Sequence, residues 1–391
     1  MVGILLATGL AASGFGGQAE QRCVAADDFE KDPVVQGWSP HGWGRYGRNL
    51  LWSDHEAVSG THSLSVSPVE ELPTGAGWES PPFAVQPGQY YRVSFSAKSA
   101  GPFFGAVLFY DSAGALVEGD RQTIVEAGAE WTSCEFMFKT KYPGKTAGVV
   151  FYPQRRAPFF VDDWKVQEVT RAKAVAAADR VWEAMPKVES VGPTSNVVRL
   201  ASAMRKLQSG GRLRVLFLGD SIANDLSNAS LDVLLERAFP GARVESEFAG
   251  RGGTGYWKLK NQIAQRVVQH EPDLVVLEAI SNDPADLGRD LGAIIDGVRK
   301  ARPETEFLLV TSHLHDIPNA TAHGDQTRAA LQVLGAEKQV PVVDLLAAWD
   351  QYLAQSGKER AYLMRDSLHM NQRGQQVSAR ALVAWFSAAA R

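Results

Sequence analysis

The chain has 391 residues, of which 45% are hydrophobic and 21% are charged, ordinary fractions that exclude intrinsic disorder, coiled coils and collagen-like structure. Forty Lys and Arg residues stand against 44 Asp and Glu residues, a net charge of -4, and no basic run provides the positive surface that nucleic-acid binding requires. At roughly 100 to 200 residues per domain, this length favours two domains.

The first residues have the pattern of a secretory signal. Met1 to Ala12 are apolar and are followed by Gly17-Gln18-Ala19, although no Lys or Arg precedes them. We interpret residues 1–26 as a signal-like or disordered segment and expect a secreted or periplasmic protein, with a disordered cytoplasmic tail as the alternative. No other stretch reaches the roughly 20 apolar residues of a membrane-spanning helix, so we expect no membrane insertion.

Residues 27–169 show a β pattern. Tyr90 to Ala97 alternates with period two, Trp131 to Phe138 and Phe159 to Val166 do so more loosely, and turns rich in Gly, Pro and Asp separate them. Short strands at this spacing predict an all-β sandwich of antiparallel sheets. The Ala-rich stretch Arg171 to Met185 favours a helix, so residues 170–212 are predicted to be a helical linker into a second domain.

Residues 213–391 alternate between apolar and amphipathic stretches. The predicted strands are Leu213 to Leu218, Ala242 to Phe248, Asp273 to Ala279, Glu306 to Thr311 and Val340 to Asp344. The predicted helices between them are Leu231 to Ala238, Leu259 to His270, Leu287 to Ala301 and Gln326 to Glu337. Apolar strands separated by helices are typical of a parallel sheet covered on both faces, so we predict a three-layer α/β/α domain.

Polar residues follow these strands at the carboxyl ends, where an open parallel sheet binds ligands. Gly219-Asp220-Ser221 follows the first strand, Gly250 to Gly255 the second and Ser281-Asn282-Asp283 the third. Asp366-Ser367-Leu368-His369 precedes the last helix. Together they supply a nucleophile, an imidazole base, a carboxylate three residues from that base, and separate donors for an oxyanion. This set predicts acyl-transfer chemistry.

The order of these blocks resembles the SGNH hydrolases, also called GDSL-type esterases, over Leu213 to Arg391. The resemblance implies a flavodoxin-like sheet and an acyl-enzyme mechanism that needs no cofactor. It also implies a catalytic triad of Ser221, His369 and Asp366. The oxyanion donors that it implies are Ser221 N–H, Gly253 or Gly252, and Asn282.

The alternatives to this interpretation are ordinary structural roles: a helix N-cap for Ser221, a turn for Asn282, and a cap of the last helix for Asp366. Asp220 receives no chemical role. Ile280 departs from the family, which usually has Gly two residues before the Asn. His313-Leu314-His315-Asp316, with His323 and Asp325, could bind a metal. We interpret this cluster instead as pocket wall.

The first domain contains six of the ten Trp residues and resembles jelly-roll carbohydrate-binding modules. The resemblance rests on Asp28-Phe29-Glu30, Gly37-Trp38, Gly60 to Leu64 and Val161 to Trp164. Exposed aromatic rings bind sugar faces in such modules. The candidate rings here are Trp38, Trp43, Tyr46 and Trp52. The resemblance also implies a structural calcium, with Glu30 and Asp163 as candidate ligands.

The two resemblances together predict a serine esterase that removes O-acetyl groups from a polysaccharide or oligosaccharide. The alternatives are a lipase or thioesterase for longer acyl esters, an acyltransferase, and a catalytically silent glycan-binding protein, to which Ile280 points. Cys23 and Cys134 are the two cysteines of the chain, so at most one disulfide within it is expected.

Overall fold

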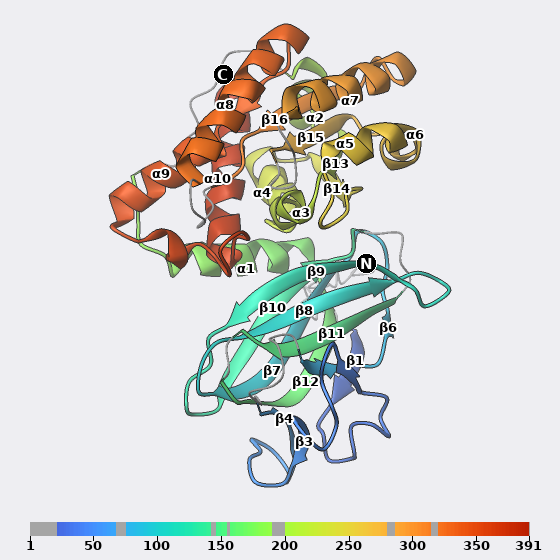
Figure 1. Cartoon of the computed structure of the whole chain (residues 1–391), viewed down its shortest axis with the longest axis vertical. Coiled ribbons are helices and arrows are strands. Elements are labelled where there is room, and N and C mark those ends of the chain that lie inside the picture. Colours follow the sequence, from blue (N-terminus) through green and yellow to red (C-terminus); the bar gives the residue numbers. More distant parts are fainter. Residues whose placement is uncertain are drawn as a thin grey trace, which may run out of the picture.

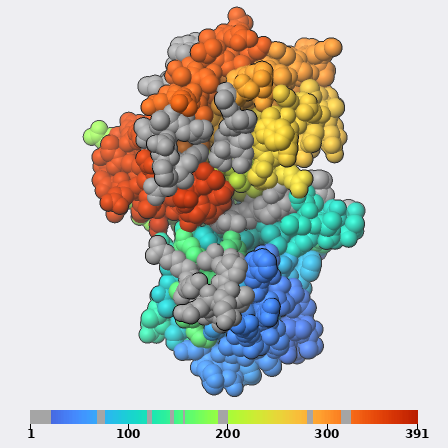
Figure 2. Space-filling model, in the orientation of Figure 1, coloured from blue at the N-terminus to red at the C-terminus, as the bar shows by residue number. Residues whose placement is uncertain are grey.

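The computed structural model describes residues 22–67, 76–141, 146–154, 157–189, 200–279, 286–313 and 320–390. They form an all-β domain and an α/β domain, stacked along the long axis of the molecule (Figure 1). In the space-filling view, the blue to teal β-domain lies below the yellow to red α/β domain (Figure 2). The predicted fold class is therefore confirmed for both. Within the described part of the chain, no helix is both long and apolar enough to cross a membrane.

The β-domain is a sandwich of two antiparallel sheets. Sheet A has the order β10-β7-β12-β4-β3, with β1 also paired to β12, and sheet B has the order β2-β5-β11-β8-β9, with β6 paired to β11. The strands of sheet A are β1 (Cys23–Asp27), β3 (Leu50–Ser53), β4 (Ser63–Val66), β7 (Tyr90–Ser99), β10 (Thr132–Lys139) and β12 (Phe159–Val169). The strands of sheet B are β2 (Ser39–His41), β5 (Gly77–Glu79), β6 (Phe83–Ala84), β8 (Phe103–Tyr110), β9 (Leu116–Val125) and β11 (Thr146–Pro153).

Aromatic side chains fill the space between the two sheets. The ring of Phe95 in β7 meets Phe151 in β11 edge-on, with centroids 4.8 Å apart, and Phe103 stacks on Phe159 at 4.1 Å. The alternation of β7 places every second side chain in this core. In sheet B, Trp78 of β5, Phe103 of β8 and Phe151 of β11 lie in this core, so the residues next to them in each strand face the outer side of the sheet.

The two cysteines lie too far apart in this sandwich for a disulfide. Cys23 is in β1 and Cys134 is in β10, and the strands β12 and β7 lie between them. Three strand spacings amount to roughly 14 Å, whereas a disulfide needs Cα atoms within about 7 Å. Both cysteines are free, and burial raises the pKa of the Cys134 thiol to about 11.

The α/β domain is built on a parallel sheet of order β14-β13-β15-β16-β17. Its strands are β13 (Arg212–Leu218), β14 (Arg243–Phe248), β15 (Leu274–Glu278), β16 (Glu306–Val310) and β17 (Val342–Val343). The helices are α1 (Arg171–Glu183), α2 (Ala201–Gln208), α3 (Ser221–Ser227), α4 (Leu231–Ala238), α5 (Tyr256–Leu259), α6 (Ile263–Arg266), α7 (Leu287–Ala301), α8 (Ala320–Lys338), α9 (Leu345–Ser356) and α10 (Gln372–Ala389), with 3-10 turns η1 (Lys260–Gln262), η2 (Val268–His270) and η3 (Arg360–Tyr362).

This strand order places the ligand-binding edge between β13 and β15. The chain moves from β13 outward to β14, then crosses back to β15 and continues in the other direction. Right-handed crossovers therefore put α4 and α7 on opposite faces of the sheet. The carboxyl ends of β13 and β15 thus meet at a switch point, where open α/β sheets bind their ligands.

The predicted helix over residues 259–270 is wrong as a single element. The structure divides it into the short turns α5, η1, α6 and η2. The Arg266 guanidinium donates to the carbonyl oxygens of Ala249 (2.7 Å) and Gly250 (3.0 Å), which ties this segment to the loop after β14. The amphipathic pattern identified the buried side of the segment, but contacts with the rest of the domain interrupt the helix and leave short turns.

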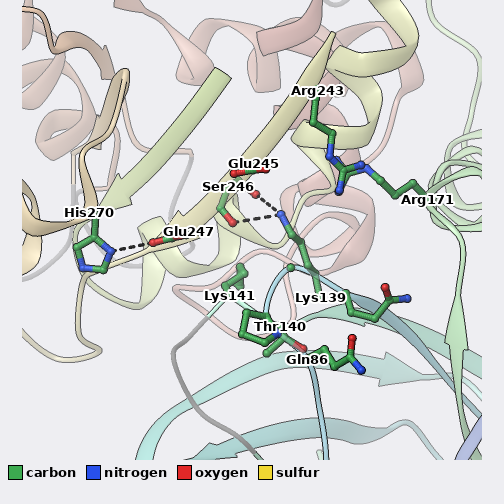
Figure 3. Close-up of a pocket in the computed structure, with 13 residues that line it drawn as sticks. Gln86, Lys139, Thr140, Lys141, Arg171, Arg243, Glu245, Ser246, Glu247 and His270 are labelled. Carbon is green, nitrogen blue, oxygen red and sulfur yellow. Dashed lines mark hydrogen bonds and ion pairs between the residues drawn. The ribbon is translucent and has the colours of Figure 1, made fainter. Parts of the chain in front are cut away.

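A buried ionic cluster joins the two domains. The carboxylate of Asp232 in α4 accepts hydrogen bonds from Lys139 Nζ (2.8 Å), Arg171 Nη2 (3.1 Å) and the Tyr90 hydroxyl (2.5 Å). Figure 3 shows Lys139 reaching Ser246 of β14 from across the cleft between the domains, a cavity of about 520 Å³. Burial alone would raise the pKa of Asp232, but the Lys139 and Arg171 charges outweigh it and lower that pKa to about 2.

This cluster is expected to make the stability of the domain interface dependent on acid pH. The pKa of Asp232 is lower in the folded protein than the value of about 3.9 in an unfolded chain. The stabilisation is therefore complete above about pH 4, and it is lost as the pH falls toward the folded value. We expect a loss of roughly 2–3 kcal/mol between pH 5 and pH 2, measured by denaturant unfolding, with a smaller pH slope in Asp232→Asn.

Glu247→Gln is the control for this prediction. Glu247 lies along the same cleft and pairs with His270 at 2.8 Å, but its side chain is 54% exposed (Figure 3). Exposed pairs contribute little, so this variant should keep the wild-type slope. An unchanged slope in Asp232→Asn would contradict the assignment.

Candidate active site

Ser221 begins α3 directly after β13. The turn is Gly219-Asp220-Ser221, and Asp220 is the N-cap, since its carboxylate accepts the Ile222 N–H at 2.8 Å. Ser221 is therefore not the cap residue of this helix. Its hydroxyl is half-buried and faces another segment of the chain.

That segment is the loop before α10, which carries His369 and Asp366. His369 Nε2 lies 2.9 Å from Ser221 Oγ, and His369 Nδ1 lies 2.9 Å from Asp366 Oδ2. Asp366 does not cap α10, because Asn371 accepts the N–H groups of Arg373 and Gly374 there. The structure thus brings the three predicted residues together in a Ser-His-Asp arrangement.

The Asp366 carboxylate is held in its ionised form. Burial alone would raise its pKa, but the His369 ring and the backbone N–H groups of Leu368 (2.8 Å) and His369 (2.7 Å) hold that pKa well below its usual range. An ionised carboxylate at Nδ1 keeps the proton on that nitrogen. Nε2 is then the atom that can accept the Ser221 proton.

Two residues that sequence reasoning did not select hold this loop in place. Arg365 Nη1 lies 2.8 Å from each oxygen of Asp225, and Asp225 stands one helical turn beyond Ser221 on α3. Burial raises the pKa of Asp225, and the Arg365 charge opposes that rise. The only sequence signal was position: Asp225 follows Ser221 at helical spacing, and Arg365 adjoins Asp366.

His313 contacts the same loop through a hydrogen bond to its backbone. Its Nε2 lies 2.9 Å from the Leu368 carbonyl oxygen, and its ring packs on Trp349 with centroids 4.9 Å apart. Its Nδ1 is 3.9 Å from Glu278, a carboxyl buried at the end of β15 whose pKa burial raises well above its usual value. The prediction that the His313 cluster forms pocket wall is therefore wrong for His313, while His315 and Asp316 lie outside the described residues.

The predicted oxyanion loop lies against the turn that carries Ser221. Arg251 N–H donates to the Gly219 carbonyl at 3.0 Å, and a Cβ on Gly250 would come within 1.9 Å of the same oxygen, so only Gly fits there. Gly253 has a φ of +65°, a left-handed conformation that favours Gly. The oxyanion hole itself stays a prediction for Gly252 and Gly253. Asn282 lies outside the described residues, as does Ile280.

The four candidate sugar-binding rings have different environments. Trp38 is only 1% exposed and packs between Phe29 and Trp164, so the prediction of an exposed ring is wrong for Trp38. Its indole N–H donates to Asp27 inside this core. A ring inside a sandwich cannot be told from a surface ring by its Gly-rich neighbours alone.

The remaining three rings reach the surface to different extents. Trp52 is half-buried and stacks on His62 at 4.2 Å, so one of its faces is already covered. Trp43 is 65% exposed and Tyr46 is 42% exposed. Sugar binding by Trp43, Tyr46 and Trp52 stays a prediction.

The residues predicted to hold calcium take part in loop contacts. The Glu30 carboxylate accepts the N–H groups of Thr61 (2.8 Å) and His62 (2.9 Å), and Asp163 accepts the Ser59 hydroxyl at 2.8 Å. Among the described residues, no group of three or more His, Cys, Asp or Glu side chains is placed to hold a metal ion. The calcium site stays a prediction, and no step of the chemistry below uses it.

Residues 217–377 match the model of the GDSL-like lipase/acylhydrolase family, a range that contains Ser221, Asp366 and His369. The match lies within the C-terminal α/β domain. This match confirms the predicted resemblance to SGNH hydrolases. No curated protein matches the chain.

Solved structures similar to the chain are distant in sequence. A xylan-binding domain from Paenibacillus barcinonensis is 14% identical, with a TM-score of 0.31 over 39% of this chain and 99% of that one. A two-domain esterase active on acetylated mannans is 20% identical, with a TM-score of 0.41 over 50% of this chain and 54% of that one. An acetylxylan esterase from Geobacillus stearothermophilus is 19% identical, with a TM-score of 0.39 over 44% of this chain and 94% of that one. The chain thus spans about half the length of the two-domain esterase.

Proposed function

We propose that this protein is an ester hydrolase that removes O-acetyl groups from a polysaccharide or oligosaccharide through an acyl-enzyme intermediate. The observation that carries the proposal is the hydrogen-bonded line from Ser221 through His369 to Asp366, with 2.9 Å at each step. In a GDSL-like domain, this line supplies the nucleophile and the base that ester hydrolysis needs.

In the proposed mechanism, His369 Nε2 takes the proton of Ser221 as its oxygen attacks the ester carbonyl carbon. Asp366 stabilises the imidazolium that forms. The imidazolium then donates the proton to the leaving sugar oxygen, the C–O bond breaks, and the acetyl group stays on Ser221. Water repeats the sequence and releases acetate. Ser221 N–H, Gly252 or Gly253, and Asn282 are the proposed oxyanion donors.

The outer face of sheet B supports a sugar as the leaving alcohol. His41 Nδ1 lies 3.0 Å from Glu79, the Tyr110 hydroxyl donates to the same carboxylate, and the Tyr152 ring lies 6.4 Å from the His41 ring. Gln154, which follows the strand that carries Tyr152, donates its side-chain N–H to the Arg365 carbonyl. Aromatic rings with fixed polar groups suit a sugar surface. The contact of Gln154 places this face next to the loop before α10 that carries Asp366 and His369, which we call the catalytic loop.

The exposure of the catalytic groups supports a bulky substrate. The His369 side chain is 21% exposed and that of Asp366 is 43% exposed. A polymer can therefore approach the triad from the surface, with only its acetyl group entering the site. A polysaccharide substrate also fits a secreted or periplasmic protein. Of the predicted signal-like or disordered segment 1–26, residues 1–21 lie outside the described part of the chain, while Cys23 to Ala26 belong to strand β1, so the predicted boundary is wrong for these residues.

One feature favours the alternative of longer acyl esters. A cavity of about 390 Å³ lies beside the Gly250 loop, with Leu116 and Val117 of β9 on one side and Phe248 and Ala249 on the other. The apolar part of this cleft, next to the oxyanion loop, is where an acyl chain would lie, while Arg251, Gln265, Arg266, Gln269 and His270 line the rest. Only such a groove tolerates long chains, so p-nitrophenyl esters of increasing acyl length separate the two functions.

The test of the proposal is an acetate-release assay on acetylated xylan, acetylated mannan and acetylated pectin, with Ser221→Ala as the blank. We expect release from at least one polysaccharide, and p-nitrophenyl esters that react more slowly as the acyl chain lengthens. A preference for long acyl chains without acetate release from any polysaccharide would support the lipase alternative.

Trp43→Ala is expected to raise KM for the acetylated polysaccharide by roughly threefold to tenfold, the range for the loss of one aromatic stacking contact. The small ester p-nitrophenyl acetate should react as in the wild type, because it does not reach this ring. Val35→Ala is the control, since Val35 is an exposed apolar residue, 81% accessible against 65% for Trp43. Equal KM values for Trp43→Ala and Val35→Ala would remove Trp43 from the sugar site.

A further inference from the structure

The β-sandwich contacts both elements that carry the triad. Lys141, just beyond β10, places Nζ 3.0 Å from Asn224 Oδ1 and 2.6 Å from Ser227 Oγ on α3. Gln154, just beyond β11, donates its side-chain N–H to the Arg365 carbonyl at 2.7 Å. Ser221 is the first residue of α3, and Arg365 adjoins Asp366. One domain thus holds the segments of the nucleophile and of the base.

The contact of Lys141 is buried. The side chains of Lys141, Asn224 and Ser227 are 4%, 7% and 6% exposed. A buried ammonium group loses its water and is stabilised by the polar groups that replace it. Lys141 Nζ also lies 5.9 Å from the ring centroid of Phe248. Any shift of α3 away from the sandwich would break these contacts, so they oppose such a shift.

The contact of Gln154 acts on the other half of the triad. The catalytic loop is closed on itself by the Arg365 N–H, which donates to the His369 carbonyl at 2.9 Å. Gln154 binds the carbonyl of the same Arg365 peptide residue from the sandwich side. A restraint at Arg365 is therefore passed to His369 through a single hydrogen bond.

The contacts of Lys141 and Gln154 both bear on the distance between the Ser221 hydroxyl and the His369 ring, across which the proton moves. Ser221 Oγ and His369 Nε2 come from segments that are far apart in the sequence and lie 2.9 Å apart. A misplacement of about 1 Å in reacting groups can cost about 100-fold in rate. A domain that contacts both α3 and the catalytic loop can fix this distance without touching the substrate.

We propose that Lys141 and Gln154 are positioning residues, through which the β-sandwich holds α3 and the catalytic loop at reacting distance. This role is separate from sugar binding and rests on the ester hydrolysis proposed above. It makes the sandwich part of the catalytic machinery even for substrates that carry no sugar.

The experiment compares Lys141→Met, Gln154→Met and their double variant with the wild-type full chain on p-nitrophenyl acetate. This ester is too small to use the outer face of sheet B. We expect each single variant to lower kcat about tenfold and the double variant more, with KM within twofold. The rate at which a fluorophosphonate labels Ser221 should fall in parallel, while circular dichroism at the assay temperature shows folded protein.

Glu126→Gln is the matched control at the same domain interface. Glu126 pairs with Arg373 of α10 at 2.6 Å, and its side chain is 58% exposed. This variant should keep the wild-type kcat. If Lys141→Met does not fold, Gln154→Met decides the question, because its side chain is only half-buried.

The outcomes separate this proposal from the proposed function. Wild-type kcat on p-nitrophenyl acetate in folded Gln154→Met and Lys141→Met would overturn the positioning role, even if KM for a polysaccharide rose. A wild-type protein that neither hydrolyses the ester nor reacts with the fluorophosphonate would instead overturn the esterase function itself.

Discussion

Ser221→Ala is expected to lower kcat for p-nitrophenyl acetate by roughly 10⁶-fold, the loss typical of a serine hydrolase without its nucleophile. The hydroxyl that donates toward His369 Nε2 at 2.9 Å is the atom that would form the bond to the acyl carbon. Without it, His369 has no serine proton to take and no acyl-enzyme forms. A residual rate of about 10³ to 10⁴ over water should remain from oxyanion donors and binding.

The measurement combines steady-state kinetics with fluorophosphonate labelling of the intact protein. The wild type should be labelled once at Ser221, and Ser221→Ala should not be labelled. Ser356→Ala is the control, because Ser356 ends α9 and its hydroxyl contacts the Leu353 carbonyl of its own helix and the Lys358 N–H just beyond it. A kcat for Ser221→Ala within about 100-fold of the wild type would show that another group is the nucleophile.

The triad was predictable because its signals are local. Gly219-Asp220-Ser221 follows an apolar strand, and Asp366 precedes His369 by three residues, a spacing at which the loop can close a carboxylate onto the imidazole. The strand order brings both segments to one edge of the sheet. The five predicted strands of the α/β domain correspond to β13 to β17 for the same reason, since a buried strand is a continuous apolar run.

The contacts that support the triad were not predictable in this way. Asp225 meets Arg365, and Lys141 meets Asn224, only through the packing of distant segments. A lone Lys or Asp in a sequence most often marks a solvated surface, and nothing local reveals its burial. Trp38 shows the reverse case, because its Gly-rich surroundings suggest a loop at the surface while the sandwich encloses its ring.

Arg365→Met is expected to destabilise the α/β domain by about 3–5 kcal/mol, the cost of removing one partner from a buried ion pair. Both side chains of the pair are 5% exposed, and the same guanidinium nitrogen also donates to the Met370 carbonyl at 2.9 Å. The variant leaves the Asp225 carboxylate without its counter-charge. Arg212→Met, which breaks an exposed pair with Glu245, should cost about 1 kcal/mol or less.

The destabilisation should depend on pH in a definite direction. Burial raises the pKa of Asp225, and removal of Arg365 takes away the charge that opposes this rise. A carboxyl whose folded pKa lies above its unfolded value destabilises the fold at high pH, where it must ionise. The deficit of Arg365→Met relative to the wild type should therefore shrink as the pH falls from 8 toward 5.

The double variant Arg365→Met/Asp225→Leu separates stability from activity. Replacing both members of a buried pair by apolar residues is often neutral or stabilising, so unfolding measurements should show most of the lost free energy restored. Activity should not return, because the ion pair that links α3 directly to the catalytic loop is still absent. If kcat on p-nitrophenyl acetate recovered together with stability, the pair would only stabilise the fold, and its charge would have no part in placing His369 against Ser221.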